Sequence, residues 1–173
     1  EKSSADVSIG TPFVPPGRAE REAGLTREVF GYFPYWFSSR WQQLDYSLVS
    51  TIAYFCAEVA SDGSITSTHG WPRYAGDPSA SASVLSMITA AHAQGVRVVL
   101  CFTNFDAPSL SALLSTPAYR ETFIAAARTL VQAGNADGVN INFEGIPSTS
   151  RDHLTAFMRA LADTLHTRFP GSQ

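Results

Sequence analysis

The sequence predicts an α/β fold in which parallel strands alternate with helices. Strand-like segments that are apolar nearly throughout alternate with segments that carry a single apolar stripe at helical spacing. Strands of this kind are expected where helices cover a parallel sheet. The chain has 173 residues, 45% of them hydrophobic, which suits one globular domain with a substantial core.

The elements follow one another along the chain as β, β, α, β, α, β, α. The expected strands and helices are, in order, Val29 to Tyr35 (strand), Leu48 to Val59 (strand), Val84 to Gln94 (helix), Val96 to Phe105 (strand), Tyr119 to Ala133 (helix), Gly138 to Phe143 (strand) and Arg151 to Arg168 (helix). The last helix shows the stripe clearly, with Leu154, Phe157, Leu161 and Leu165 on one face.

Helix ends are marked by the expected residue types. Gly95 directly precedes the third strand and Gly134 precedes the fourth, so both are predicted to be left-handed helix caps. Thr116 followed by Pro117 predicts a helix start with proline in the first turn.

Two domain-level expectations follow from this order. Residues 1–27 contain several prolines and glycines with little periodicity, and are interpreted as an irregular leader or linker before a domain at 28–173. Four strands are too few for a closed eight-stranded barrel, which takes roughly 250 residues. The segment is therefore either a small open α/β domain or the first half of a barrel, with the rest supplied elsewhere.

Composition limits the ligand classes. A net charge of −3 and a pI of 5.8, with no block of like charges, argue against nucleic acid or an anionic membrane as partner and favour a neutral ligand. No apolar stretch has the roughly 20 residues that span a bilayer. The four histidines are scattered, so no metal site is predicted, and without a phosphate loop or a nucleotide fingerprint no cofactor is predicted either. Cys56 and Cys101 fall in strands and are interpreted as small buried hydrophobes, with a disulfide between them as the alternative.

The fourth strand carries polar residues at every second position. Asn140, Asn142 and Glu144 point to one face of this strand, whereas Val139 and its alternating neighbours point to the other. One interpretation is three polar residues satisfied by buried hydrogen bonds. The other is a polar ladder that leads to a general acid, in which a partly desolvated site raises the pKa of the terminal carboxyl group.

The same segment resembles a family signature. The run Asp137-Gly138-Val139-Asn140-Ile141-Asn142-Phe143-Glu144 is similar to the D-G-x-D-x-D-x-E strand of glycoside hydrolase family 18, the chitinase family, and matches it at Asp137, Gly138 and Glu144. Phe30 to Trp36, Ile52 to Ala57 and Gly95 to Leu100 resemble the first three strands of that family. The resemblance covers about residues 28–170. Cys101 to Phe105 depart from the common third-strand ending and are closer to the branch that cleaves peptidoglycan and spore cortex.

The resemblance implies a fold and a set of roles. It implies the first four β/α units of a (β/α)8 TIM barrel, incomplete in this chain, with Glu144 as general acid of a retaining, substrate-assisted glycosidase. Asn142 stands where the family has an aspartate that holds the substrate acetamido group, Asn140 lies below it, and Asp137 belongs to the same catalytic motif. The amide oxygen of Asn142 accepts the same N–H but carries no full negative charge. Relative to aspartate, this change is expected to lower the rate by on the order of 10²- to 10³-fold.

Two hypotheses stay open. The first is a glycosidase acting on β-linked N-acetylglucosamine in peptidoglycan, chitin or an N-glycan core. An asparagine two residues before the acid is compatible with catalysis, because the similar family 85 endo-N-acetylglucosaminidases have this Asn-x-Glu arrangement. The second is a chitinase-like protein that binds carbohydrate and has lost turnover. The substrate implies a secreted or periplasmic bacterial protein, and the half barrel implies a missing C-terminal half or a second polypeptide as partner.

Further side chains near strand ends are candidates for sugar binding, with packing or structural roles as the alternative. They are Tyr32, Tyr35, Trp36, Glu58, Trp71 and Asn104, together with Asp106.

Overall fold

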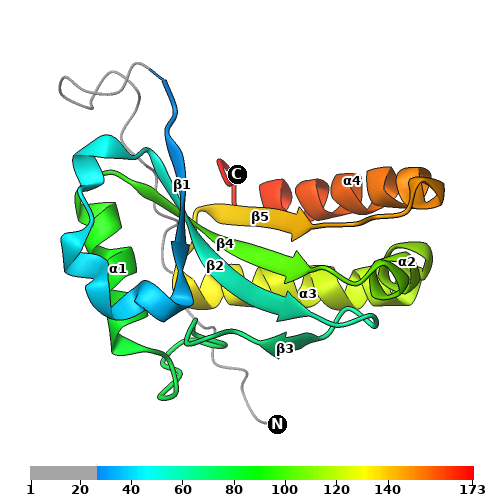
Figure 1. Ribbon diagram of the computed structural model, residues 1–173, viewed down its shortest axis with the longest axis horizontal. Coiled ribbons are helices and arrows are strands. Elements are labelled where there is room, and N and C mark those ends of the chain that lie inside the picture. The colour runs from blue at the N-terminus through cyan, green and yellow to red at the C-terminus, as the bar shows by residue number, and fades with distance from the viewer. Residues whose placement is uncertain (1–26) are drawn as a thin grey trace, which may run out of the picture.

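The computed structural model describes residues 27–173, in which a parallel sheet lies against helices (Figure 1). Of the leader expected at residues 1–27, all but the last residue lies outside the described part of the chain. The elements are β1 (Phe30–Pro34), η1 (Tyr35–Gln43), η2 (Tyr46–Leu48), β2 (Thr51–Val59), β3 (Ile65–Ser67), α1 (Ala82–Ala93), β4 (Arg97–Asn104), α2 (Ala107–Ser115), α3 (Pro117–Gly134), β5 (Gly138–Phe143), η3 (Ser148–Ser150) and α4 (Arg151–Arg168).

The sheet has the order expected for successive β/α units. β1, β2, β4 and β5 are neighbours in that order and pair in parallel, while β3 pairs antiparallel with the end of β2. The α/β prediction and its four strands are confirmed. Since the strands are parallel, their carboxyl ends meet at one edge of the sheet, where loops place side chains together.

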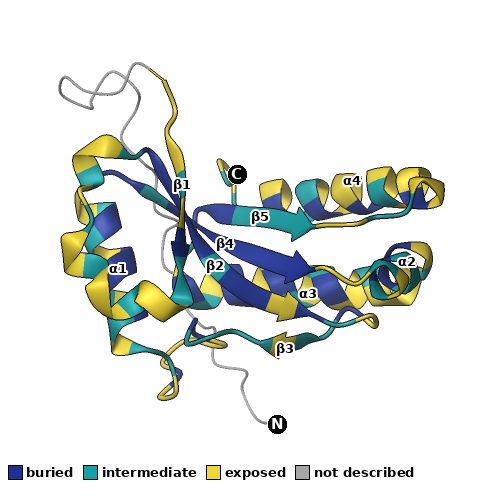
Figure 2. Ribbon diagram, viewed as in Figure 1, coloured by how far each residue is buried: buried dark blue, intermediate teal, exposed yellow. Residues whose placement is uncertain are grey.

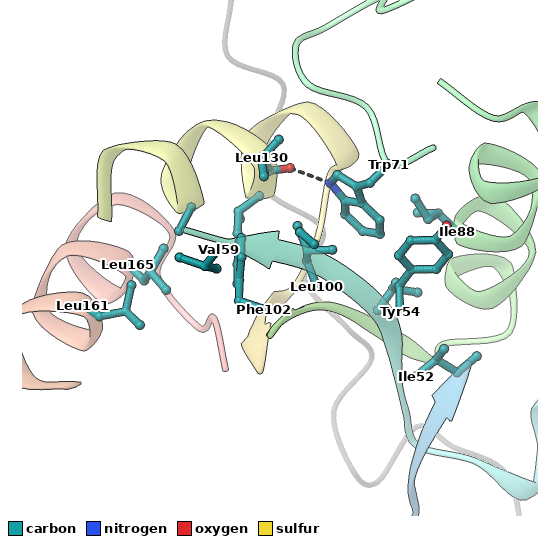
Figure 3. Packing of buried hydrophobic residues seen from close by; sticks show 14 of the residues in the cluster. Ile52, Tyr54, Val59, Trp71, Ile88, Leu100, Phe102, Leu130, Leu161 and Leu165 are labelled. Atoms are coloured by element: carbon teal, nitrogen blue, oxygen red, sulfur yellow. Dashed lines mark hydrogen bonds between the residues drawn. The ribbon is translucent and has the colours of Figure 1, made fainter. Parts of the chain in front are cut away.

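One face of the sheet is covered by the helices and forms the main core. Leu100 and Phe102 of β4 lie between the central strands and the helices, as Figure 3 shows. Phe123 of α3 meets Phe102 at a ring-centroid distance of 5.0 Å and Phe157 of α4 at 5.3 Å. Figure 2 shows the buried residues concentrated along β2 and β4. The strands are therefore held mainly through their outer, helix-facing side chains.

The opposite face of the sheet carries small side chains. Ala53, Cys56, Val99 and Cys101 form a second buried cluster, with Phe55 packed against it. Both cysteines are free buried thiols, which agrees with their interpretation as small hydrophobes. Burial raises the pKa of Cys101 to about 12, so this thiol stays protonated at neutral pH.

The connections differ from the prediction in three places. Between β1 and β2 the described chain forms only the 3-10 turns η1 and η2, and Asp45 caps η2 by accepting a hydrogen bond from the Ser47 N–H. The unpredicted helix α2 begins at Ala107 and is capped by Asp106, whose carboxylate accepts from the Ser109 N–H at 2.8 Å. The short strand β3 is also additional, and extends β2 into a hairpin.

Helix ends confirm one glycine prediction and correct the other. Gly95 has φ of +69° after α1, as expected for a left-handed cap. After α3, however, Asn135 takes the left-handed conformation with φ of +50°, and Gly134 is the last residue of the helix. A Cβ on Gly134 would lie 2.2 Å from the indole of Trp71, so glycine is required there for close packing. Thr116 and Pro117 begin α3 as predicted.

Candidate active site

The polar residues of β5 lie on the face away from the helices. Val139, Ile141 and Phe143 pack against the main core, which leaves Asn140 and Asn142 on the inner face, as the alternation predicts. Glu144 follows the last strand residue, and its N–H donates to the carbonyl of Asn104 at 3.1 Å. This bond extends the β4–β5 pairing by one residue and fixes the backbone of Glu144 at the carboxyl edge of the sheet.

Asn140 connects the two outer strands of the parallel set. The hydroxyl group of Tyr32 in β1 donates to Oδ1 of Asn140 in β5 at 3.2 Å, although β2 and β4 lie between these strands in the sheet order. The sheet therefore curls enough for side chains from both edges to meet over its inner face. Such curvature is what a strand set needs in order to form part of a barrel.

Asn142 and Glu144 have open side chains. Within residues 27–173, neither the amide of Asn142 nor the carboxyl group of Glu144 makes a hydrogen bond to a described residue. Asn142 is half-buried and Glu144 is exposed. The described residues therefore place Asn142 and Glu144 on one face of the strand. They do not bury the Glu144 carboxyl group, as was expected for a general acid.

The aromatic candidates Tyr35 and Trp36, which follow β1 in η1, differ in what their rings contact. Trp36 is 58% exposed and makes T-shaped contacts with Phe55 and Tyr35, so its indole is accessible to a ligand. The ring of Tyr35 instead lies flat against the imidazole of His69, with centroids 3.7 Å apart. Tyr35 therefore supports another side chain, and its stacked face is not available to a ligand.

Trp71 lies in the core and not in a sugar site, which corrects the expectation from its loop position. Its side chain is 1% exposed, and its Nε1–H donates to the carbonyl of Leu130 at 2.9 Å. The ring packs on Tyr54 under the helices, as Figure 3 shows. The sequence of this Gly/Pro-rich loop does not indicate that its tryptophan points into the core and packs between α1 and α3.

Asn104 and Asp106 are structural at the end of β4. The Asn104 amide donates to the carbonyl of Val59 and to Oγ of Ser109, and its Oδ1 accepts from the Asp106 N–H. Asp106 caps α2. Because the Asn104 side chain is buried and both its amide nitrogen and its Oδ1 bond to residues of the same chain, it is held as a structural residue, contrary to the expectation for it.

Asp137 lies at the opposite end of β5 from Glu144. Its buried carboxylate accepts from the N–H of Val98 at 2.7 Å and lies 2.9 Å from Nε2 of His92. These contacts join the starts of β4 and β5 to the end of α1. The structure thus separates Asp137 from the other motif residues and gives it a structural contact set, in contrast to its expected place among the catalytic groups.

Glu58 is at the carboxyl end of β2, where the sequence predicted a ligand-facing residue, and it has a partner that sequence reasoning missed. Nε2 of His69 lies 2.9 Å from Oε1 of Glu58. The 10 intervening residues include the β2–β3 hairpin, which brings His69 back over the strand end. The periodicity of helices and strands does not predict that the hairpin brings His69 back to Glu58. From the sequence, His69 is therefore only one of four scattered histidines.

No group of three or more histidine, cysteine, aspartate or glutamate side chains that could hold a metal ion occurs among residues 27–173. In that same range, no helix is both long and apolar enough to cross a membrane.

Comparison with known proteins identifies the family. The model for "Glycosyl hydrolases family 18" matches residues 28–170. The C-terminal domain of a predicted chitinase from Desulfitobacterium hafniense DCB-2 superposes with a TM-score of 0.67 at 25% identity, over 82% of this chain and 43% of that one. A Bacteroides thetaiotaomicron chitinase gives a TM-score of 0.64 at 18% identity, over 78% and 42%.

The spore cortex-lytic enzyme SleL of Bacillus cereus also superposes, with a TM-score of 0.61 at 16% identity over 81% of this chain and 33% of that one. No curated protein sequence matches the chain. The chain spans less than half the length of each of these solved structures, so its fold is that of part of a TIM barrel. On the family match over residues 28–170, the chain belongs to glycosyl hydrolase family 18.

Proposed function

We propose that this chain contributes the first half of the active site of a retaining glycosidase that cleaves β-linked N-acetylglucosamine polymers. The observation that carries the proposal is the row formed by Asn140, Asn142 and Glu144, which runs along the inner face of β5 to the carboxyl edge of the sheet in a family 18 chain. Peptidoglycan is the first substrate to test and chitin the second, because the neighbours include both chitinases and a spore cortex-lytic enzyme.

In this mechanism Glu144 is the general acid. Its proton passes to the glycosidic oxygen as the bond from that oxygen to the anomeric carbon breaks. The carbonyl oxygen of the substrate's own acetamido group bonds to the anomeric carbon, which gives a cyclic oxazolinium ion. Water then opens this ring and loses a proton to the Glu144 carboxylate, so that the anomeric configuration is retained and the acid is regenerated.

Asn142 holds the acetamido group in this proposal. Its Oδ1 accepts the acetamido N–H, which orients the carbonyl oxygen toward the anomeric carbon. An amide dipole stabilises the positive oxazolinium ion less than a carboxylate does. The reaction is therefore slow relative to that of a site with aspartate, by on the order of 10²- to 10³-fold.

A complete groove requires more sheet than residues 27–173 provide. The backbone of Gln173 donates to the Asp137 carbonyl and accepts from the Val139 N–H, the pattern of a parallel bridge to Gly138 at the free edge of β5. This pairing is compatible with another parallel strand beside β5. We infer that further β/α units, from a continuation of the chain or a second polypeptide, complete the barrel and cover Glu144. Since both candidate polymers lie outside the cytoplasm, we expect a secreted or periplasmic bacterial protein.

A second candidate function is carbohydrate binding without turnover. The specific observation in its favour is Asn142, since loss of the family aspartate removes charge stabilisation and still leaves a hydrogen-bonding groove. The retained Glu144 favours the enzyme, because binding alone does not need an acid at that position.

Native mass spectrometry comes first, to identify the assembly that completes the sheet. Release of products from N-acetylglucosamine oligomers is then measured for the wild type and for Glu144→Gln and Asn142→Asp. The enzyme hypothesis predicts slow wild-type cleavage, none with Glu144→Gln, and a rise in kcat of on the order of 10²- to 10³-fold with Asn142→Asp. The double variant is the control and should be inactive. Oligomer binding with no cleavage in wild type or Asn142→Asp would favour the binding protein.

A further inference from the structure

His69 is held by its N–H, its carbonyl oxygen and its ring, in a backbone conformation that is unusual for its residue type. It has φ of +46°, the left-handed region that residues other than glycine rarely adopt. Its N–H donates to Oγ of Ser67, and its carbonyl oxygen accepts from the hydroxyl group of Tyr54. The imidazole is stacked on Tyr35 with an interplanar angle of 7°. Backbone strain that the surroundings enforce in this way is typical of functional sites.

The imidazole fixes the carboxylate of Glu58. Nε2 lies 2.9 Å from Oε1, and the two side chains are 19% and 51% exposed, so Glu58 still faces solvent. In the neutral tautomer that carries its proton on Nε2, the ring donates to the Glu58 carboxylate and Nδ1 keeps a lone pair. Among residues 27–173, no described group bonds to Nδ1 of His69 or to Oε2 of Glu58. In that tautomer, the pair presents two acceptors without a partner among the described residues.

The pair lies at the same edge of the sheet as the proposed catalytic residues. Glu58 is in register with Thr103 of β4, and Thr103 is in register with Asn142 of β5. Paired residues of a parallel sheet lie level with one another, and two strand spacings put Glu58 about 10 Å from Asn142. Glu58 therefore approaches a bound polymer from β2, two strands away from the β5 residue Asn142. Glu58 is thus placed to contact a neighbouring sugar of a bound polymer.

We propose that Glu58, positioned by His69, forms a second sugar subsite that selects units with hydrogen-bond donors and disfavours units with a carboxylate. The inference rests on the proposed function, because it requires a bound sugar polymer. Hydroxyl and amino groups donate to the two free acceptors, and the ammonium group of a de-N-acetylated glucosamine unit also gains attraction to the Glu58 carboxylate. A unit with a free carboxylate, such as a muramic acid without its peptide, meets a like charge, and its 3-hydroxyl donor is replaced by an ether oxygen.

The test compares three probes in the complete protein assembly by isothermal titration. They are chitotetraose, the same tetramer with a de-N-acetylated unit, and a peptide-free tetramer of alternating N-acetylglucosamine and muramic acid. The wild type should bind both chitin-derived tetramers at least about tenfold more tightly than the carboxylate-bearing one. Glu58→Gln should reduce this ratio to within about threefold, chiefly through better binding of the anionic tetramer, since the repulsion is removed while an acceptor is kept.

Variants of His69 separate positioning from charge. His69→Ala leaves Glu58 unanchored and should weaken chitotetraose binding by about five- to tenfold. His69→Gln keeps a donor toward Glu58 and should restore most of that loss. Glu121→Gln, which removes a carboxylate from an exposed position of α3, is the matched control and should leave all three affinities unchanged. Thermal midpoints are measured for each variant, so that unfolding is not read as lost binding.

The outcomes distinguish the two proposals. Failure of the wild type to bind any oligomer overturns the proposed function and this subsite with it. If oligomers bind but Glu58→Gln leaves the ratio unchanged, or His69→Gln is as weak as His69→Ala while folded, the subsite is wrong and the proposed function stands.

Discussion

Substitution of Gly134 by alanine tests how tightly α3 and Trp71 are packed. A Cβ built on Gly134 lies 2.2 Å from Cζ2, 2.4 Å from Cε2 and 2.7 Å from Nε1 of the Trp71 indole. Carbon atoms in contact prefer about 3.5 to 4.0 Å, so the ring would have to recede by more than an ångström. The ring is not free to do so, because it is fully buried and bonded to the Leu130 carbonyl at 2.9 Å.

The sign of the effect follows from two opposing magnitudes. Alanine in a helix interior is more favourable than glycine by about 1 kcal/mol, and less than that applies to Gly134 because it is the last helical residue. Overpacking of a well-packed core costs about 1 to 3 kcal/mol. The clash here involves a rigid ring on one side and helix backbone on the other, so the upper part of that range is expected. Gly134→Ala should therefore destabilise the protein.

The assay is urea denaturation of four proteins that form a double-mutant cycle: wild type, Gly134→Ala, Trp71→Phe and the double variant. Phenylalanine lacks the indole atoms that the new methyl group would strike. Gly134→Ala should thus cost about 2 kcal/mol in the wild type and less than about 1 kcal/mol in the Trp71→Phe background, a coupling typical of residues in contact. An unchanged or higher free energy of unfolding for Gly134→Ala in the wild-type background would refute the packing argument, as would equal costs in both backgrounds.

Three further predictions test individual contacts. Asp137→Ala should lower the free energy of unfolding by about 1 to 3 kcal/mol, because the buried Val98 N–H loses its acceptor, while titration should show oligomer affinity unchanged. Tyr32→Phe removes only an exposed hydroxyl bond to Asn140, and urea denaturation should show a loss below about 1 kcal/mol. Burial raises the pKa of Cys101 to about 12 from a usual value near 8.5, so stability present below pH 8.5 should decline as the pH rises from there toward 12. Denaturation at pH 7 and 10, with Cys101→Ala as control, measures that decline, and native protein should resist thiol reagents.

Much of the fold could be predicted because its main signals are local. The strands of the parallel set and the helices at 84–94, 119–133 and 151–168 were found within a few residues of their observed bounds. The short elements were missed. The helix α2 has nine residues with a proline and two serines before its last residue, too short for a hydrophobic period to emerge. The sequence predicts Gly134 as a helix cap. In the structure, a glycine is needed there because the indole of Trp71, which is distant in sequence, packs against it.

The site could be predicted only where it lies on a strand. Alternation within β5 fixed the face of Asn142 and Glu144, since side chains of a strand point alternately to the two sides. Trp71 depends instead on the path of a loop, and that path decides whether an aromatic ring packs in the core or faces a ligand. The His69 and Glu58 contact depends on a hairpin return. Contacts of this kind arise from tertiary structure and leave no period in the sequence.

The distribution of satisfied and unsatisfied polar groups separates the structural residues from those available to a ligand. Asp137 and Asn104 resemble site residues in sequence, yet their buried side chains are bonded within the chain. Asn142, Glu144 and Glu58 lie at the carboxyl edge of the sheet, and each keeps at least one acceptor with no partner among residues 27–173. Polar groups buried by a fold are expected to be paired, so acceptors left open along one edge are those that a substrate could use. On this argument, we expect Asn142, Glu144 and Glu58 to face a ligand, and Asp137 not to do so.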